Sequence, residues 1–114
     1  MSHLSILPTV LRDTRLLAAS LVELGFEPHW GGALSGFAGD TEAVELQVWI
    51  GSDLALGWRR QPNGELALVG DLQRLSRSHQ VGPLLGRLTR SYAARSALRD
   101  AGRLLPTASV QLSR

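Results

Sequence analysis

The sequence contains no cysteine and no lysine, and aromatic residues make up only 5% of it. Without cysteine, the chain cannot form disulfides, thiolate metal sites, thiolate-held iron–sulfur clusters or a cysteine nucleophile. No apolar run reaches the ~18 residues of a membrane span, and the opening Met-Ser-His-Leu-Ser lacks the basic flank and long apolar stretch of a secretory signal. We therefore expect a cytoplasmic protein that does not associate with membranes.

Motifs of common active sites are also missing. The glycines match neither a dinucleotide-binding fingerprint nor a P-loop, and no Gly-x-Ser-x-Gly elbow occurs. The three histidines, His3, His29 and His79, are far apart and lack the spacing of metal ligands. We therefore expect no enzyme activity, no cofactor and no metal. The enzymatic or small-molecule-binding alternative would need a pocket lined by Ser35, Asp53 and Asp71.

Size and composition indicate one folded domain. The chain has 114 residues, of which 44% are hydrophobic and 19% charged. Disordered chains instead combine low hydrophobicity with high net charge, and single domains usually contain about 100–200 residues. We expect a single domain over residues 1–114.

Local patterns predict an α+β fold. Pro8 predicts that the first strand lies at a sheet edge or contains a bulge, because proline cannot donate a ladder hydrogen bond. Asp13 is a suitable helix N-cap and Gly25 a suitable C-cap residue, whereas Asn63-Gly64 favours a hairpin turn. The expected fold is one antiparallel meander sheet with two helices packed on it. Its expected elements are strands over 3–11, 42–50, 54–60, 65–69 and 109–112, helices over 14–24 and 83–102, and a loop or short helical turn over 73–80. Residues 26–39 are expected to form a strand, a turn and a second short strand around 34–37.

Charge is divided along the chain. Residues 1–57 hold two arginines and seven acidic residues, a net charge of −5, whereas residues 58–114 hold ten arginines and three acidic residues, a net charge of +7. Such a division can mean that the two halves attract each other within one domain. It can also mean a basic face for an anionic partner.

The arginines of the last third of the chain are the candidate partner-binding residues. Guanidinium groups form paired hydrogen bonds with carboxylates and phosphates, so we expect an acidic protein partner, with RNA or DNA binding as the alternative. Few aromatics accompany these arginines, which disfavours stacking on single-stranded nucleic acid. Exposed edge strands make a homo-oligomer plausible. The candidate residues are Arg74, Arg77, Arg87, Arg95, Arg99 and Arg103, together with Tyr92, whereas Arg90 points elsewhere in helical projection.

Trp49 lies on the polar side of an alternating strand. Either the sheet is covered on both faces, or this aromatic side chain is exposed for a partner. We expect it to be partly buried.

Five short segments, in order, resemble one known family over nearly the whole chain. Leu34-Ser35-Gly36-Phe37-Ala38-Gly39 is similar to an Arg-Gly-Tyr-x-Gly turn, and Leu56-Gly57-Trp58 to an Ile-Gly-Phe strand. Residues 65–71 are similar to Tyr-Glu-Leu-Val-Ala-Asp, residues 87–93 to a helix with Leu-Thr-Gln-x-Tyr-Ala, and Met1-Ser2-His3-Leu4-Ser5 to the usual opening. The family is the hypothetical chloroplast reading frame thirty-five group, or domain of unknown function twelve fifty-seven, of cyanobacteria, plastids and other bacteria.

The resemblance implies a divergent member of a family without established activity. Ser35 stands where the family has arginine, Phe37 where it has tyrosine, Ala55 where it has aspartate, and Ala94 where it has an aromatic residue. Family genes often lie near those of ferredoxins and small partner proteins, so the resemblance implies an accessory or assembly role.

Overall fold

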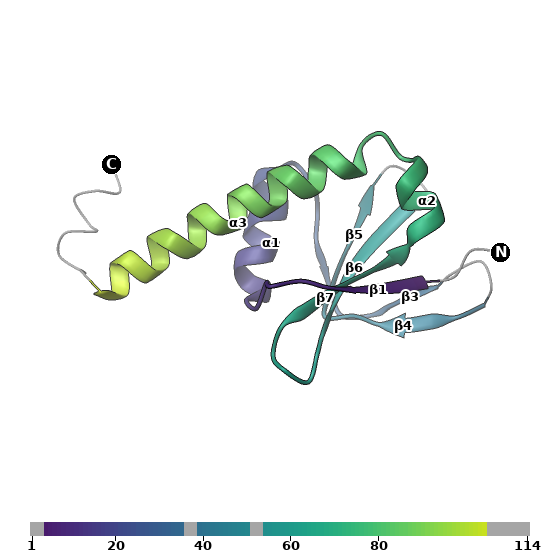
Figure 1. Ribbon diagram of the computed structural model, residues 1–114, viewed down its shortest axis with the longest axis horizontal. Coiled ribbons are helices and arrows are strands. Elements are labelled where there is room, and N and C mark those ends of the chain that lie inside the picture. The colour runs from purple at the N-terminus through teal and green to yellow at the C-terminus, as the bar shows by residue number, and fades with distance from the viewer. Residues whose placement is uncertain (1–3, 36–38, 51–53, 105–114) are drawn as a thin grey trace.

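A computed structural model of the chain describes residues 4–35, 39–50 and 54–104. It is an α+β structure with a five-stranded antiparallel sheet, a second two-stranded sheet and three helices (Figure 1). This confirms the expected fold class. The elements are β1 (Leu4–Pro8), α1 (Thr14–Glu23), β2 (His29–Trp30), β3 (Ala33–Ser35), β4 (Thr41–Ala43), β5 (Leu46–Ile50), β6 (Leu54–Arg60), β7 (Leu66–Asp71), α2 (Leu72–Arg77) and α3 (Val81–Leu104).

The larger sheet has the strand order β1-β7-β6-β5-β2. Strand β1, which contains Pro8, lies at an edge as predicted. Strands β6 and β7 form the predicted hairpin, whose turn is closed by the Gly64 N–H donating to the carbonyl of Gln61. Gly64 has a φ of +88°, the left-handed conformation that glycine adopts without steric cost. The predicted strand over 109–112 lies outside the described residues.

Helix α1 begins and ends where its capping residues predict. The carboxylate of Asp13 accepts hydrogen bonds from the backbone N–H groups of Arg15 and Leu16, at 2.9 and 3.2 Å. Gly25, just beyond the helix, has a φ of +94°. The helix turns Leu17 and Leu21 toward the sheet, and both side chains are fully buried.

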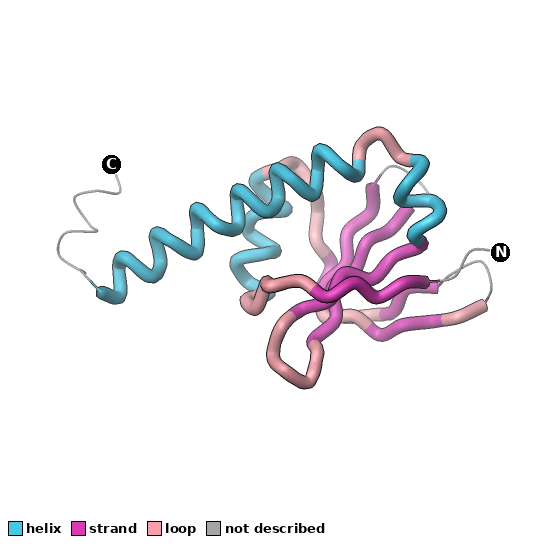
Figure 2. The backbone as a smooth tube through the Cα atoms, in the orientation of Figure 1, coloured by secondary structure: helices cyan, strands magenta, loops and turns pink. Residues whose placement is uncertain are grey.

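The main core lies between one face of the larger sheet and the helices. Burial of these aliphatic side chains is the dominant favourable contribution to folding. Alternate residues of β5 and β6, including Leu46, Val48 and Leu56, meet Leu17 and Leu21 of α1 there. Figure 2 shows α1 and α3 packed side by side next to the strands.

The segment 42–50 is two strands, which corrects the expectation of one. Only β5 belongs to the larger sheet, whereas β4 pairs with β3 in the second sheet. Val44 lies at the break and joins Leu34 and Val69 in a small cluster separate from the main core. Simple alternation misses this break because both strands keep the same period of two residues.

The described residues form three helices, one more than the expected two. Helix α2 occupies the segment for which a loop or short helical turn was predicted. Helix α3 begins two residues before the predicted start at Pro83 and runs past α1, so that its last turns extend away from the sheet (Figure 1). Several side chains in this part of the helix, including Leu98, are exposed.

Candidate functional site

Helix α3 has an inner side that packs on the core. Leu84 and Leu88 are 3% and 2% exposed, and Tyr92 packs against the same cluster. At about 100° per residue, Arg95 and Arg99 continue this side toward the C-terminus. Both arginines therefore face α1 and are only partly exposed to solvent.

Two ion pairs fasten the inner side of α3 to α1. Arg95 Nη2 lies 3.0 Å from Glu23 Oε1, and Arg99 Nη1 lies 2.6 Å from Asp13 Oδ2. The Ser91 hydroxyl also donates to Glu23 Oε1, at 2.7 Å. This hydrogen bond, followed by the bond and charge of Arg95, lowers the pKa of Glu23. Two of the candidate arginines thus already hold acidic partners within the chain.

Tyr92 also makes internal polar contacts. Its hydroxyl oxygen accepts hydrogen bonds from the backbone N–H groups of Arg12 and Asp13, at 3.2 and 3.0 Å. The tyrosine thereby holds the loop that leads into α1 against α3. Its part in partner binding stays a prediction.

The outer side of α3 is exposed along most of the helix. Arg87 and Arg90 lie on it near the start, and Leu98, which is 63% exposed, lies farther along. No carboxylate among the described residues lies within ion-pair distance of Arg87 or Arg90. We call this surface the outer face of α3; its residues are Arg87, Arg90, Ala94, Ala97, Leu98 and Ala101, all exposed.

The remaining candidate arginines lie elsewhere. Arg77 is exposed at the end of α2, and Arg74 is partly buried in the same helix. Arg103 belongs to the last turn of α3, but its side chain lies outside the described part of the structure. The helical projection excluded Arg90 from the candidate residues, but Arg90 lies on the outer face together with Arg87. The position of Leu98 on the same projection was the signal that could have shown this.

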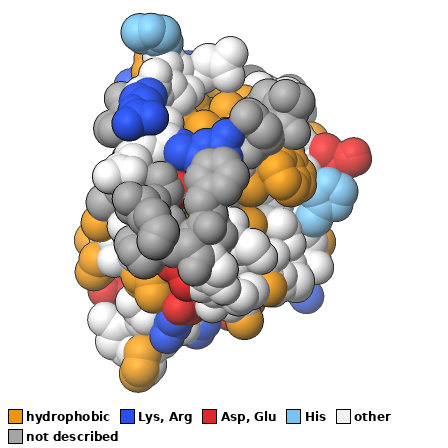
Figure 3. All heavy atoms as spheres, turned by 90° about the vertical axis from the view of Figure 1, so that its right-hand side faces the viewer, with side chains coloured by type: hydrophobic (Ala, Val, Ile, Leu, Met, Phe, Trp, Pro, Cys, Tyr) orange, Lys and Arg blue, Asp and Glu red, His pale blue; other side chains and the backbone are white. Residues whose placement is uncertain are grey.

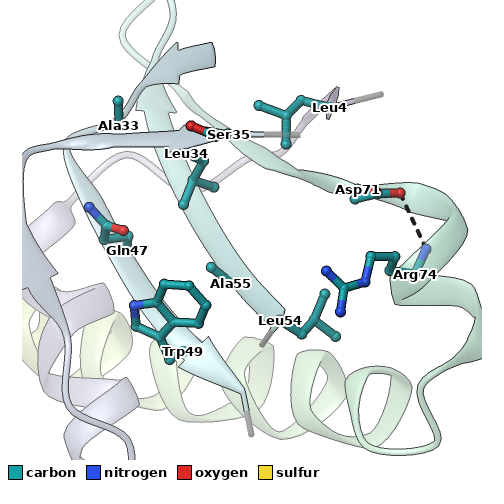
Figure 4. Close-up of a pocket in the computed structure, with 10 residues that line it drawn as sticks. All are labelled: Leu4, Ala33, Leu34, Ser35, Gln47, Trp49, Leu54, Ala55, Asp71 and Arg74. Atoms are coloured by element: carbon teal, nitrogen blue, oxygen red, sulfur yellow. Dashed lines mark hydrogen bonds between the residues drawn. The ribbon is translucent and has the colours of Figure 1, made fainter. Parts of the chain in front are cut away.

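A pocket of about 410 Å³ lies on the opposite face of the larger sheet from α1 and α3 (Figure 4). Ser35 and Asp71, predicted for the small-molecule alternative, both line it, whereas Asp53 lies outside the described residues. Figure 3 shows hydrophobic and basic side chains next to one another at the end of the molecule that carries the N-terminus and α2. The pocket is lined by Leu4, Ala33, Leu34, Ser35, Gln47, Trp49, Leu54, Ala55, Asp71 and Arg74.

Sequence reasoning missed most of this pocket. Trp49, which is 51% exposed, was considered for burial and partner contact but not for a pocket. Arg74 was assigned to a partner surface. The sequence signal that could have indicated the pocket was the small residue Ala55 on the strand next to that of Trp49, which lies on the polar side of its own strand.

Two kinds of site are absent from the described residues. They contain no group of three histidine, aspartate or glutamate side chains that could hold a metal ion. None of the described helices combines the length and the hydropathy needed to cross a membrane.

The fold and the site define a small α+β protein whose last helix presents arginine and aliphatic side chains on one uncovered side. The family model described as "Protein of unknown function (DUF1257)" matches residues 20–104, and the chain belongs to this family. No curated protein and no solved structure matches the chain. The family name thus agrees with the resemblance in the sequence, while the chloroplast reading frame and the divergence stay predictions.

Proposed function

We propose that this protein is a non-enzymatic accessory or assembly module that binds an acidic protein partner through the outer face of α3. Arg77, an exposed arginine at the end of α2, precedes Arg87 and Arg90 in the sequence and adds to the positive charge of this part of the chain. The proposal drops Arg95 and Arg99 from the predicted set, because Glu23 and Asp13 pair with them, and it adds Arg90, which the sequence had excluded. Arg87 and Arg90 keep their charge available to another molecule.

The exposure of Leu98 in line with Arg87 and Arg90 is the observation that carries the proposal. Protein interfaces combine an apolar centre with arginine, and truncating a few central residues removes most of the binding energy. A nucleic acid backbone would use the two guanidinium groups but would leave the leucine and the neighbouring alanines in water. A protein partner accounts for both parts of the face.

The test is capture from native extract with a tagged form of the protein, followed by mass spectrometry and direct binding of the captured protein. We expect a partner with an acidic surface, whose binding is lost in R87E/R90E and strongly weakened in L98S. The matched control is R15E, since Arg15 is an exposed arginine on α1. Unchanged binding by R87E/R90E would contradict the proposal.

The nucleic-acid alternative predicts a different result. Binding of any RNA or DNA would weaken steeply with salt, because phosphate neutralisation releases counterions. It would be lost in R87E/R90E but unchanged in L98S, which removes the apolar side chain without changing the charge. These two outcomes together would identify the partner as a nucleic acid and not an acidic protein.

A further inference from the structure

The pocket on the second face of the larger sheet is built from five strands and α2. Trp49 of β5 pairs with Ala55 of β6, and Leu4 of β1 pairs with Asp71 of β7, so these residues lie at the same end of the sheet. Leu34 and Ser35 of β3 border the other side (Figure 4). The volume of about 410 Å³ falls within the range of small-molecule sites in proteins.

Asp71 brings an unmet hydrogen-bond acceptor to the pocket wall. The residue is only 7% exposed. Its Oδ1 accepts the backbone N–H of Arg74 at 3.3 Å, but its Oδ2 is buried without any hydrogen-bond partner. A buried acceptor without a partner is unfavourable. Because Oδ2 has almost no accessible surface, a ligand donor reaches it only through a small movement of the pocket wall, and the new hydrogen bond would offset the cost of that movement.

Trp49 supplies an aromatic surface at the opposite side of the pocket. Half of its side chain is exposed, although the rest of its strand is largely buried. Figure 4 shows the indole ring near Ala55, with the guanidinium of Arg74 across the pocket from it. Because Ala55 is small, a flat ring has space to lie against the indole, and stacking on an aromatic side chain tolerates many ring types.

We propose that this pocket binds a small planar nitrogen heterocycle, stacked on Trp49 and donating a ring or exocyclic N–H to Asp71. An apolar ligand would leave the carboxylate oxygen unsatisfied, and a flexible polar ligand would gain nothing from the indole face. A heterocycle with an N–H at its edge meets both. Arg74 already has another interaction within the protein, and the proposal does not depend on its charge.

Two further polar groups limit how the ring can lie. The side-chain amide of Gln47 is held in place, because its Nε2 donates to the carbonyl of Gly31 at 2.8 Å. The hydroxyl of Ser35 is exposed at the pocket border. Both can donate to or accept from a heterocycle whose far edge carries carbonyl or ring nitrogen atoms.

The test is NMR titration of the ¹⁵N-labelled protein with two matched probes. Theophylline is a planar fused heterocycle with one ring N–H, and caffeine is the same ring with that N–H methylated. We expect theophylline to shift the indole N–H resonance of Trp49, which can be assigned because it is missing from the spectrum of W49F. A hydrogen bond to a charged acceptor predicts an affinity for theophylline about tenfold or more above that for caffeine.

Asp71→Asn is the decisive variant. Asparagine caps helices as well as aspartate does, so D71N keeps the start of α2 but presents an amide in place of the carboxylate. The theophylline affinity should fall to that of caffeine, and D100N on α3 should leave both unchanged. Equal binding of the two probes, absent binding at millimolar concentration, or full theophylline binding by D71N would each overturn the proposal.

A second variant keeps the proposal testable if D71N does not fold. Ala55→Leu adds three carbons at the pocket floor and should abolish the theophylline shift. Ala97→Leu makes the same change on the outer face of α3 and should not affect it. Theophylline binding retained by a folded A55L would overturn the proposal. The R87E/R90E variant tests only the binding of the acidic protein partner, so its result does not bear on the pocket.

Discussion

Asp13 performs two tasks with its two carboxylate oxygens. Oδ1 caps α1, and Oδ2 accepts the Arg99 guanidinium of α3. Replacing Asp13 by alanine removes both contacts and should lower the free energy of unfolding by about 1–2 kcal/mol, mostly through the lost cap. Urea denaturation measures this.

Asp13→Asn separates the two tasks. Asparagine keeps the cap but removes the charge that faces Arg99, and a partly exposed ion pair contributes only about 0–1 kcal/mol. D13N should therefore be clearly more stable than D13A. Equal losses in the two variants would mean that the ion pair, and not the cap, carries the effect.

Tyr92 joins the start of α1 to α3 through one oxygen atom. Tyr92→Phe leaves the backbone N–H groups of Arg12 and Asp13 without this acceptor. We expect a loss of about 1–2 kcal/mol in the free energy of unfolding, because both groups lose a hydrogen bond while the ring still packs. If folded Y92F also loses the acidic partner, Tyr92 contacts the partner as the sequence suggested.

Among the elements, the second sheet depends on one glycine of the first. A Cβ on Gly57 would lie 2.7 Å from Val44 Cγ1 and 2.8 Å from Leu34 Cδ1, so only glycine allows β3 and β4 to approach this closely. Gly57→Ala should destabilise the protein by about 1–3 kcal/mol through overpacking. Thermal unfolding measures the change.

Gly86→Ala is the matched control for this prediction. Its Cβ would meet nothing closer than the Arg90 guanidinium at 3.6 Å. Because alanine is favoured over glycine within helices by up to about 1 kcal/mol, G86A should raise the melting temperature. A neutral G57A would show that the second sheet moves away from Gly57 at little cost.

At the scale of the whole molecule, four ion pairs among the described residues join the acidic half of the chain to the basic half. They connect Asp13 with Arg99, Glu23 with Arg95, Glu42 with Arg59 and Glu45 with Arg60. The acidic and basic halves therefore attract each other within one molecule, which is the first of the two interpretations of the charge division in the sequence. Among the described side chains of α2 and α3, Arg77, Arg87 and Arg90 are the exposed arginines that take part in none of these pairs.

These pairs predict how stability depends on pH. The pKa of Glu45 is lowered mainly by its hydrogen bond to Arg60, and that of Glu23 by Ser91 and Arg95. A carboxylate with a lowered pKa in the folded state stabilises the protein above its unfolded value of 4.5 and loses this contribution as pH falls through the folded value. The free energy of unfolding should therefore decrease below about pH 4.5.

Glutamine variants identify the groups responsible. E45Q and E23Q should each reduce the slope of stability against pH in the acid range, since their side chains no longer titrate. E27Q serves as the control, because Glu27 is exposed and has no ion pair among the described residues. An unchanged acid slope in E45Q/E23Q would assign the pH dependence to other carboxylates.

The sequence alone determined the α+β class, α1 with its caps, the β6–β7 hairpin and the absence of cysteine chemistry, because each depends on neighbouring residues and local periodicity. Tertiary structure decided what periodicity could not show. Alternation is the same in both sheets, so only the pairing of β4 with β3 and of β5 with β6 reveals that residues 42–50 divide between them. Likewise, the sequence supplied an excess of arginine, but the contact with α1 decided which guanidiniums are neutralised within the chain and which remain on the outer face of α3.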